Sequence, residues 1–317
     1  MLAAFYREKG SLSLEEIEIP EPKANEVQVR IKENTICGST DMKIISGIRD
    51  AVFGRDIILG HESSGIITQT GGLVAGFRPG DRVACECWGT YAEYACTTTD
   101  KIQHIPFDMT WTEAALAELA MKVYQMAARN ILPGDTVVIL GQGAAGLIFT
   151  QMAAAMGASR IITTDLYDRK LELSKSFGAD HTINASHEDV IKKVGAYTRG
   201  IGADVVIEAA GVRETVETAP YVAKRYGATI LQFGVPPTNA EYSFSRMHDY
   251  GQTMLTIGSC RFIEPDLPYK RAIRLISEGK IKLDAFVTHR FSLKDINRAF
   301  ELLKRNPGEV IKIAIEN

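Results

Sequence analysis

Residues 136–146, with the sequence TVVILGQGAAG, decide the fold of this chain. A β-branched apolar run leads directly into a G-x-G-x-x-G pattern formed by Gly141, Gly143 and Gly146. The first glycine allows a tight turn, the second lets the backbone approach a pyrophosphate, and the third lets a helix pack closely on the strand. The pattern therefore predicts a strand, a phosphate-binding turn and a helix. A glycine turn that binds nothing is the alternative.

Residues 136–159 form an uncharged stretch that is long enough to cross a bilayer. It nevertheless contains Gln142, Gln151 and the three turn glycines. Polar side chains and turns are costly in hydrocarbon, so a membrane span is rejected.

Apolar runs alternate with helical patterns after residue 136, as expected for parallel strands that are covered on both faces. The predicted strands are residues 136–140, 160–164, 181–183, 205–209, 229–233 and 254–257. The predicted helices are residues 144–156, 168–177, 187–197 and 214–224. This pattern predicts an α/β fold with a doubly wound parallel sheet of the Rossmann type.

The first hundred residues instead indicate a mostly-β module. Its predicted strands are residues 27–32, 57–59, 64–70, 82–87 and 91–96, and a linking helix is predicted over residues 112–130. Helical patterns return over residues 267–306, interrupted by a strand at Val287 and Thr288, and residues 310–315 form a last strand. That strand has no place in the six-stranded sheet, so we expect it to return to the first module.

The helix after the glycine turn offers the free N–H groups of Ala144 and Ala145 to phosphates. Asp165 ends the next strand 19 residues after Gly146, where a carboxylate accepts hydrogen bonds from the adenosine ribose. This carboxylate predicts NAD as the cofactor, because it would repel the 2′-phosphate of NADP. Arg169 lies one helical turn further on, and either packs over the adenine or reaches a 2′-phosphate.

Cys37, His61 and Glu62 supply a thiolate, an imidazole and a carboxylate in the mostly-β module. These are the ligand types that zinc prefers, and three protein ligands with one open position are typical of a catalytic zinc site. Taken singly, the cysteine is more often a small core residue, and the His-Glu pair is more often surface polarity.

Together these motifs identify a family resemblance over essentially the whole chain. The chain resembles the zinc-dependent medium-chain alcohol and polyol dehydrogenases, in particular the sorbitol and threonine 3-dehydrogenases. The motifs that support the resemblance are Cys37-Gly38-Ser39, Gly60-His61-Glu62-x-x-Gly65, Pro79-Gly80-Asp81-Arg82-Val83, Tyr91-Ala92-Glu93-Tyr94, the glycine turn with Asp165, and Val287-Thr288-His289-Arg290-Phe291. The resemblance implies a GroES-like, mostly-β catalytic domain of residues 1–122 and 261–317. It encloses a Rossmann NAD-binding domain of residues 123–260.

The resemblance also implies roles for single residues. Cys37 and His61 are expected to bind one catalytic zinc with Glu62 as third ligand, and Ser39 is expected to relay the substrate proton. Glu118 would bind the zinc or its water, although a helix-surface acid is the alternative because the proline that follows it in relatives is missing. The residues expected to contact substrate are Arg261, Phe262 and Tyr91.

One departure from the family concerns a second metal. Most relatives insert a lobe with four cysteines, whereas this chain runs from Val83 to Tyr91 in eight residues. We therefore expect no structural zinc, and we interpret Cys85, Cys87 and Cys96 as core residues rather than as a weak second site.

Composition narrows the function classes. The chain has 36 Lys and Arg against 39 Asp and Glu, which gives a net charge of −3. It therefore lacks the excess positive charge that attracts nucleic acid or anionic lipid. Arg7, Glu8 and Lys9 stand where a signal peptide is apolar, so a cytoplasmic protein is expected. The relatives suggest a homodimer or homotetramer.

The predicted activity is NAD- and zinc-dependent oxidation of a secondary alcohol to a ketone by hydride transfer. The substrate would be a polyol, a cyclitol or an amino alcohol. Two alternatives are a zinc-free NAD(P)H quinone or enoyl reductase of the same superfamily and a non-catalytic dinucleotide-binding protein.

Overall fold

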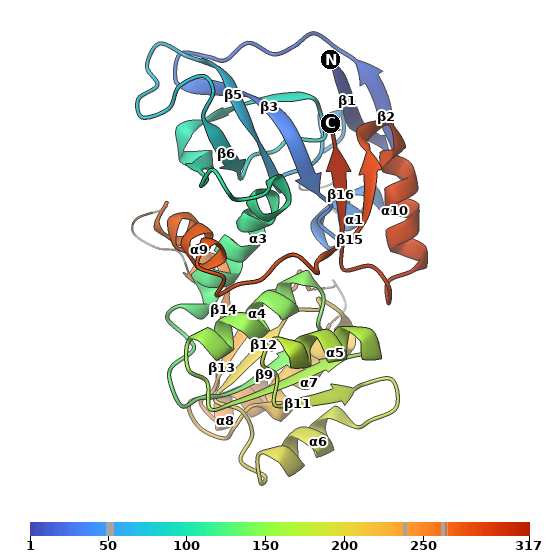
Figure 1. The fold of residues 1–317 in the computed structure, drawn as a ribbon. Coiled ribbons are helices and arrows are strands. Elements are labelled where there is room, and N and C mark those ends of the chain that lie inside the picture. Colours follow the sequence, from blue (N-terminus) through green and yellow to red (C-terminus); the bar gives the residue numbers. More distant parts are fainter. Residues whose placement is uncertain (49–53, 237–239, 261–263, 265) are drawn as a thin grey trace. The chain divides into compact units, whose positions relative to one another are not determined.

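A computed structural model describes residues 1–48, 54–236, 240–260, 264 and 266–317 (Figure 1). The chain divides into two compact units. Unit 1 consists of residues 1–121 and 265–317, and unit 2 consists of residues 122–264.

Unit 2 is built on a six-stranded parallel sheet whose strand order is β11-β10-β9-β12-β13-β14. The strands are β9 (Thr136–Leu140), β10 (Arg160–Asp165), β11 (His181–Asn184), β12 (Val205–Glu208), β13 (Thr229–Gln232) and β14 (Thr253–Thr256). The doubly wound α/β fold predicted from the alternating pattern is thereby confirmed. The chain order reverses between β9 and β12, and this reversal marks the place where such sheets bind ligands.

Helices cover both faces of this sheet. They are α4 (Ala144–Ala155), α5 (Asp168–Ser176), α6 (Val190–Tyr197), α7 (Arg213–Val222) and α8 (Phe244–Asp249). Residues of α6 and α7 join one face of the sheet in a single core cluster that includes Val194, Val206 and Val222. The helices α4 and α5 lie in front of the sheet in Figure 1.

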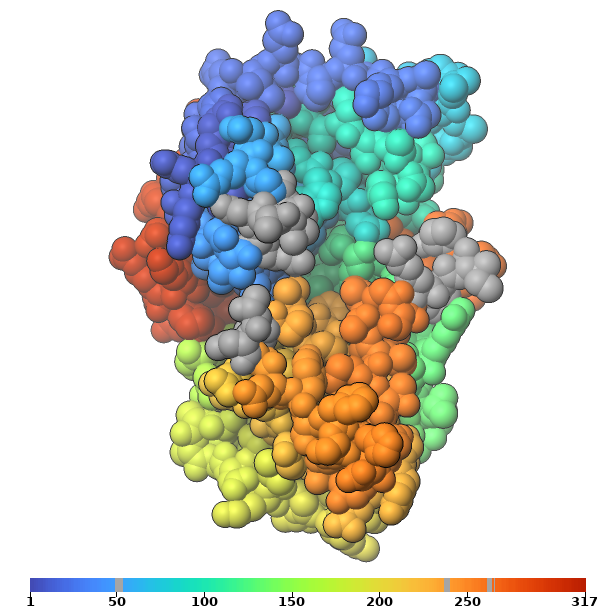
Figure 2. Space-filling view, turned by 180° about the vertical axis from the view of Figure 1, so that it is seen from behind, coloured from blue at the N-terminus to red at the C-terminus, as the bar shows by residue number. Residues whose placement is uncertain are grey.

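Several boundaries in unit 2 differ from the predicted ones by a few residues, and the start of α6 differs most. The helix α6 begins at Val190 rather than at residue 187, because the Asp189 side chain caps it by accepting a hydrogen bond from the Lys192 N–H. The segment that contains α8 and the edge strand β14 forms part of the surface and is coloured orange in Figure 2. Phe244 at the start of α8 is 76% exposed.

Unit 1 contains a seven-stranded sheet with the order β15-β16-β3-β5-β6-β8, to which β7 adds by pairing with β3. Its strands are β3 (Glu26–Thr35), β5 (Ser63–Thr70), β6 (Arg82–Cys85), β7 (Tyr94–Thr98), β8 (Ile102–His104), β15 (Val287–Ser292) and β16 (Lys312–Glu316). The last strand, β16, pairs antiparallel with β3 and parallel with β15. The expected return of the last strand to the first module is confirmed.

A smaller sheet with the order β2-β1-β4 completes the strands of unit 1. It consists of β1 (Leu2–Glu8), β2 (Ser11–Glu16) and β4 (Ile57–Ile58). The sequence did not indicate β1 and β2, whose outer positions carry charged residues such as Arg7 and Glu15. The strand predicted over residues 91–96 is β7 instead, which begins three residues later at Tyr94.

The helices of unit 1 among the described residues are α1 (Thr40–Ile45), α3 (Trp111–Ala127, whose last residues belong to unit 2), α9 (Leu267–Ser277) and α10 (Ile296–Arg305). Short 3-10 turns are η1 (Thr99–Lys101), η2 (Ile257–Cys260, in unit 2) and η3 (Leu293–Asp295). The helix α10 buries Ile296, Ala299 and Phe300 at helical spacing against a core that also contains Ile313 of β16. None of the described helices is long and apolar enough to cross a membrane.

Candidate functional site

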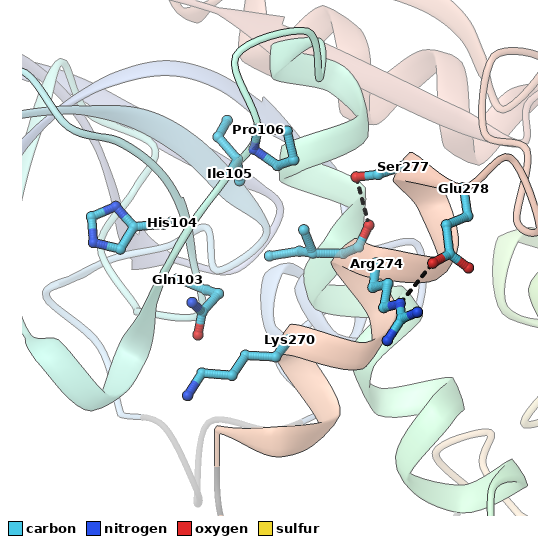
Figure 3. Close-up of a pocket in the computed structure, with 9 residues that line it drawn as sticks. Gln103, His104, Ile105, Pro106, Lys270, Arg274, Ser277 and Glu278 are labelled. Carbon is cyan, nitrogen blue, oxygen red and sulfur yellow. Dashed lines mark hydrogen bonds and ion pairs between the residues drawn. The ribbon is translucent and has the colours of Figure 1, made fainter.

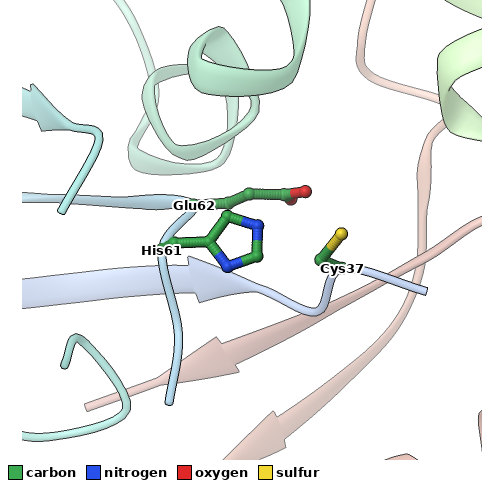
Figure 4. A group of neighbouring side chains, drawn as sticks. All are labelled: Cys37, His61 and Glu62. Atoms are coloured by element: carbon green, nitrogen blue, oxygen red, sulfur yellow. The ribbon is translucent and has the colours of Figure 1, made fainter. Parts of the chain in front are cut away.

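Unit 1 brings together three of the four residues that were predicted to bind the metal. Cys37 follows β3, and the His61-Glu62 pair lies between β4 and β5. The Thr35 N–H donates to the Glu62 carbonyl over 2.9 Å, and this bond holds the two segments side by side. One ligand atom from each of Cys37, His61 and Glu62 lies within 4.8 Å of the other two (Figure 4). Among the described residues, no further carboxylate, imidazole or thiol joins this group at that distance.

Gly60 sets the direction in which the chain enters this group. Its φ is +90°, a conformation that side chains rarely adopt, and an added Cβ would lie 2.7 Å from the Tyr91 backbone nitrogen. The sequence before His61 therefore requires glycine for both conformation and space.

A buried carboxylate faces His61. Asp41 of α1 is fully buried, and its Oδ1 lies 3.5 Å from His61 Nδ1, while neither atom has another hydrogen-bond partner among the described residues. Asp41 Oδ2 accepts from the Cys37 N–H over 3.1 Å and from the Tyr91 hydroxyl over 2.6 Å. Burial lowers the pKa of His61, but the charges of Asp41 and Cys37 and the hydrogen bonds with them raise it well above its ordinary value. Asp41 therefore fixes both Cys37 and His61.

Glu62 makes a second buried contact, with Lys312 of β16. The Lys312 ammonium and the Thr35 hydroxyl both donate to Glu62 Oε2, and Lys312 also donates to the Ile36 carbonyl over 3.1 Å. Burial lowers the pKa of Lys312, but the nearby charges of Glu62 and Cys37 outweigh this effect and raise it. Lys312 is therefore charged at neutral pH.

The remaining predicted residues of unit 1 differ in position. Ser39 Oγ lies 3.9 Å from Cys37 Sγ, close to the group of ligands. Glu118 is buried on α3, with 5% exposed, outside the 4.8 Å group, and its charge is among those that raise the pKa of Lys312.

The expectation that Tyr91 contacts substrate is wrong. Its side chain is fully buried, its hydroxyl donates to Asp41, and its ring packs edge-on against Phe300. These contacts leave no face of Tyr91 for a substrate, so its role is to hold Asp41. The other two predicted substrate residues, Arg261 and Phe262, lie outside the described residues.

The three cysteines interpreted as core residues are Cys85, Cys87 and Cys96. Cys85 and Cys87 are buried in one core cluster, and the hydrogen bond with Cys87 together with burial raises the pKa of Cys85 well above its ordinary value. Cys96 donates to the Pro20 carbonyl over 3.4 Å, and burial raises its pKa to about 11.

Sequence reasoning missed Asp41, Lys312 and Trp88. The Trp88 ring lies 4.6 Å from the His61 ring, between centroids, and is 44% exposed. Lys312 stands 250 positions after Glu62, and no local pattern links the two. Asp41 could have been found, because it follows Cys37 by four residues at the start of a helix, a spacing that returns its carboxylate to the Cys37 backbone.

In unit 2 the glycine turn has the geometry that its spacing predicts. Gly141 has a φ of +97°, and an added Cβ at Gly146 would lie 1.9 Å from the Gly141 carbonyl oxygen. An added Cβ at Gly143 would meet nothing within 4 Å, so the turn is open at its second glycine. Ala144 and Ala145 begin α4 directly after it. The N–H groups of this helix start are available to a phosphate.

Asp165 ends β10 beside this turn. Its Oδ2 accepts from the Gln142 N–H over 2.7 Å, and its Oδ1 accepts from the Leu166 N–H over 2.8 Å. Arg169 is exposed, whereas the following residue, Lys170, is 8% exposed, with its pKa lowered by burial against the opposing charge of Asp165. The sequence analysis named Arg169 and missed Lys170, whose charged form the nearby Asp165 carboxylate favours.

A groove of about 530 Å³ also lies in unit 1, between β8 and α9 (Figure 3). It contains none of the predicted site residues. Two of its lining residues, Arg274 and Glu278, pair with each other over 2.6 Å.

Comparison with known proteins supplies the family. Residues 23–107 match the alcohol dehydrogenase GroES-like domain, and residues 144–278 match the zinc-binding dehydrogenase domain. The chain is 32% identical to a D-xylulose reductase of Saccharomyces cerevisiae, over 97% of this chain and 95% of that protein. The chain belongs to the zinc-type medium-chain polyol dehydrogenase family.

Two solved structures share the whole fold. Galactitol-1-phosphate dehydrogenase from Escherichia coli superposes with a TM-score of 0.89 at 26% identity, covering 100% of both chains. A zinc-binding dehydrogenase from Sinorhizobium meliloti 1021, solved bound to NADP, superposes with a TM-score of 0.86 at 28% identity, again covering 100% of both chains. The expected combination of a GroES-like domain with a Rossmann sheet is confirmed.

Proposed function

We propose that this protein is an NAD- and zinc-dependent dehydrogenase that oxidises a secondary alcohol to a ketone. The observation that supports this most strongly is the Cys37, His61 and Glu62 group, whose ligand atoms lie within 4.8 Å of one another in a member of this family. A polyol, a cyclitol or an amino alcohol is the proposed substrate class. The relatives named for xylulose and galactitol 1-phosphate belong to the same chemistry of polyhydroxylated substrates.

The three side chains fit a zinc ion. A thiolate, an imidazole and a carboxylate match its preferences, and three protein ligands leave one position open. Asp41 faces His61 Nδ1 at 3.5 Å, which supports Nε2 as the proposed metal-binding nitrogen. Lys312 and Thr35 occupy Glu62 Oε2, which leaves Oε1 for the metal. When bound, zinc acts as a Lewis acid that lowers the pKa of an alcohol hydroxyl.

Residues near the ligand group provide a route for the substrate proton. When bound, NAD would accept a hydride from the carbinol carbon, and with loss of the hydroxyl proton the products would be a ketone and NADH. Ser39, next to Cys37, is proposed to accept that proton and pass it to solvent. Glu118 is proposed to influence the metal site electrostatically. Its charge helps to raise the pKa of Lys312, which contacts Glu62.

Asp165 supports NAD over NADP. Its carboxylate repels a 2′-phosphate and has capacity to accept a ribose hydroxyl besides its backbone partners. The glycine turn, with the N–H groups of Ala144 and Ala145, is proposed to hold the pyrophosphate, and Arg169 is proposed to lie near the adenine. The second candidate is an enzyme that uses both NAD and NADP. The NADP-bound relative and the buried Lys170 favour it.

We further propose one zinc per chain. The burial of Cys85 and Cys87 in one core cluster supports a packing role, and the raised pKa of Cys85 favours its protonated form, which does not bind metal. The catalytic domain is proposed to comprise residues 1–122 and 261–317, with Arg261 and Phe262 contacting substrate. A cytoplasmic homodimer or homotetramer is proposed by analogy with the family.

The test is a panel of polyols, cyclitols and amino alcohols with NAD and, separately, NADP, read as absorbance of the reduced cofactor. The expected result is oxidation of a substrate with vicinal hydroxyls in preference to a primary alcohol of equal length. Reduction of quinones or enones without added metal would favour the zinc-free reductase instead. Cofactor binding without any turnover would favour a non-catalytic dinucleotide-binding protein.

A further inference from the structure

The sheet of unit 2 indicates where each half of a dinucleotide lies, and this step rests on the proposed function. The order reverses between β9 and β12, so the binding crevice lies at the carboxyl ends of these two strands. The glycine turn follows β9 and Asp165 ends β10, which assigns the adenosine half to that side of the crevice. The nicotinamide half must therefore lie over the carboxyl ends of β12 and β13.

A buried carboxylate organises this second side. Glu208 ends β12 and is fully buried. Its Oε1 accepts from the Ala210 N–H over 3.0 Å, from the Gly211 N–H over 2.8 Å and from the Thr215 hydroxyl over 2.7 Å. One carboxylate oxygen thus fixes the loop after β12 and connects it to α7.

The other oxygen fixes the loop after β13. Glu208 Oε2 accepts from Gln232 Nε2, which also donates to the Gly234 carbonyl over 2.8 Å. An added Cβ at Gly234 would lie 2.4 Å from the Gly211 nitrogen and 2.6 Å from Glu208 Oε2. The two loops are therefore packed backbone to backbone around this carboxylate.

The same loops touch the phosphate turn. An added Cβ at Gly141 would lie 2.8 Å from the Ala210 Cβ and 3.0 Å from the Ala210 nitrogen. Glu208 therefore controls how the loop after β12 meets the phosphate turn, and so how the two halves of the crevice are aligned.

The Glu208 carboxylate is stabilised by uncharged hydrogen-bond donors. No lysine, arginine or histidine among the described residues lies within 4.0 Å of its carboxylate. Burying a carboxylate without a cation is costly unless its oxygens accept hydrogen bonds, and here Oε1 accepts three and Oε2 accepts one. Packing alone would be satisfied by an apolar residue at lower cost, so the carboxylate indicates a need to fix these particular loops.

We propose that Glu208 is a positioning residue for the nicotinamide half of the dinucleotide. It holds the loops after β12 and β13 in the conformation that receives that half, and it does not itself contact the adenosine half. Its loss should therefore weaken the binding of NAD much more than the binding of ADP, which fills only the adenosine and phosphate side.

The experiment measures dissociation constants for NAD and for ADP by calorimetry on the purified full-length protein. Glu208→Gln keeps the shape but places an amide donor against Gln232 or against the backbone N–H groups. We expect the dissociation constant for NAD to rise about 10- to 100-fold, and the one for ADP to change less than about twofold.

Thr215→Val is the milder second variant, because it removes a single donor to Glu208 Oε1 and leaves the charge in place. We expect a smaller change in the same direction. Thr198→Val is the matched control: Thr198 is buried on the same unit and accepts from the Gly202 N–H over 3.0 Å, away from the carboxyl ends of the strands. It should alter neither dissociation constant.

The outcomes separate the two claims. Equal losses for NAD and ADP, or unchanged NAD binding in both Glu208→Gln and Thr215→Val, would overturn the role of Glu208 while NAD binding by the wild-type protein stands. If Glu208→Gln does not fold, Thr215→Val decides alone. A wild-type protein that binds neither NAD nor ADP would overturn the proposed cofactor, and the inference with it.

Discussion

The Lys312 ammonium and the Glu62 carboxylate form an ion pair inside unit 1, with 4% and 1% of the two side chains exposed. Removing one partner of a buried pair leaves the other charge uncompensated, which is strongly destabilising. Glu62 is also a proposed zinc ligand, so a metal ion and Lys312 would stabilise the same carboxylate from two sides. The pair therefore couples folding of unit 1 to the metal site.

Lys312→Met should lower the free energy of unfolding of the metal-free protein by roughly 3 kcal/mol, because it leaves Glu62 buried without a cation. Zinc supplies positive charge at the same carboxylate, so the loss should be smaller in the zinc-loaded protein. Thermal unfolding with and without zinc measures both. Arg274→Met, in the exposed pair with Glu278, is the control and should change neither value appreciably. An equal loss with and without zinc would argue against a metal at Glu62.

Trp88 should report metal binding by fluorescence. Its ring lies 4.6 Å from the His61 ring, and the chain has only one other tryptophan, Trp111, which packs on the Arg82 guanidinium at 4.2 Å. Adding zinc to the metal-free protein should change the emission of wild type and of Trp111→Phe. The change should vanish in Trp88→Phe. A response that survives in Trp88→Phe would place the metal away from His61.

Asp165→Ala should narrow the preference for NAD over NADP. The substitution removes the repulsion of a 2′-phosphate and the hydrogen bonds to the ribose together, while the buried Lys170 remains to attract the phosphate. The ratio of kcat/KM for the two cofactors measures the effect. Arg169→Ala, at an exposed position, is expected to change this ratio less. A wild-type protein that prefers NADP would mean that nearby cations outweigh Asp165.

Asp204 should make the stability of unit 2 depend on pH in the acidic range. Burial raises its pKa, but the hydrogen bonds from Lys224 Nζ, at 2.6 Å, and from the Thr136 N–H, at 2.8 Å, outweigh this effect and lower it. A lowered folded-state pKa gives stability that is present above the unfolded value, near 4, and is lost as pH falls through the folded value.

Asp204→Asn should therefore cost about 1 kcal/mol of unfolding free energy at pH 7, and the difference from wild type should shrink below about pH 4. Denaturant unfolding at a series of pH values measures it. Asp249→Asn, at an exposed side chain, is the matched control. A difference that stays constant down to pH 3 would contradict the role of the Asp204 charge.

The fold could be predicted where the chain's own pattern determines it. The strands of unit 2 are covered on both faces, so they appear as continuous apolar runs, and the glycine spacing fixes the turn after β9. The strands β1 and β2 were missed because their exposed positions carry charge and the alternation is weak. In such surface strands the pairing partner, rather than the local pattern, decides the structure.

The same distinction applies to the candidate site: residues with a local sequence pattern could be predicted, and residues defined by distant contacts could not. Cys37, His61 and Glu62 have ligand chemistry that is visible in the sequence, and the structure brings them together. Lys312 and Asp41 have no such signature, because their importance lies in the contacts they make across the fold. Tyr91 was misassigned for the same reason: an aromatic residue in a motif does not reveal whether it faces a cleft or a buried carboxylate.

The most direct test of the proposed zinc-dependent activity is a zinc titration of chelator-stripped protein, with NADH formation from a vicinal diol as the readout. We predict that activity is lost on chelation, returns linearly, and saturates at one zinc per chain, and that Cys37→Ser stays folded but recovers little activity. Full activity in the stripped protein, or saturation at two zinc ions per chain, would contradict a single catalytic zinc at Cys37, His61 and Glu62.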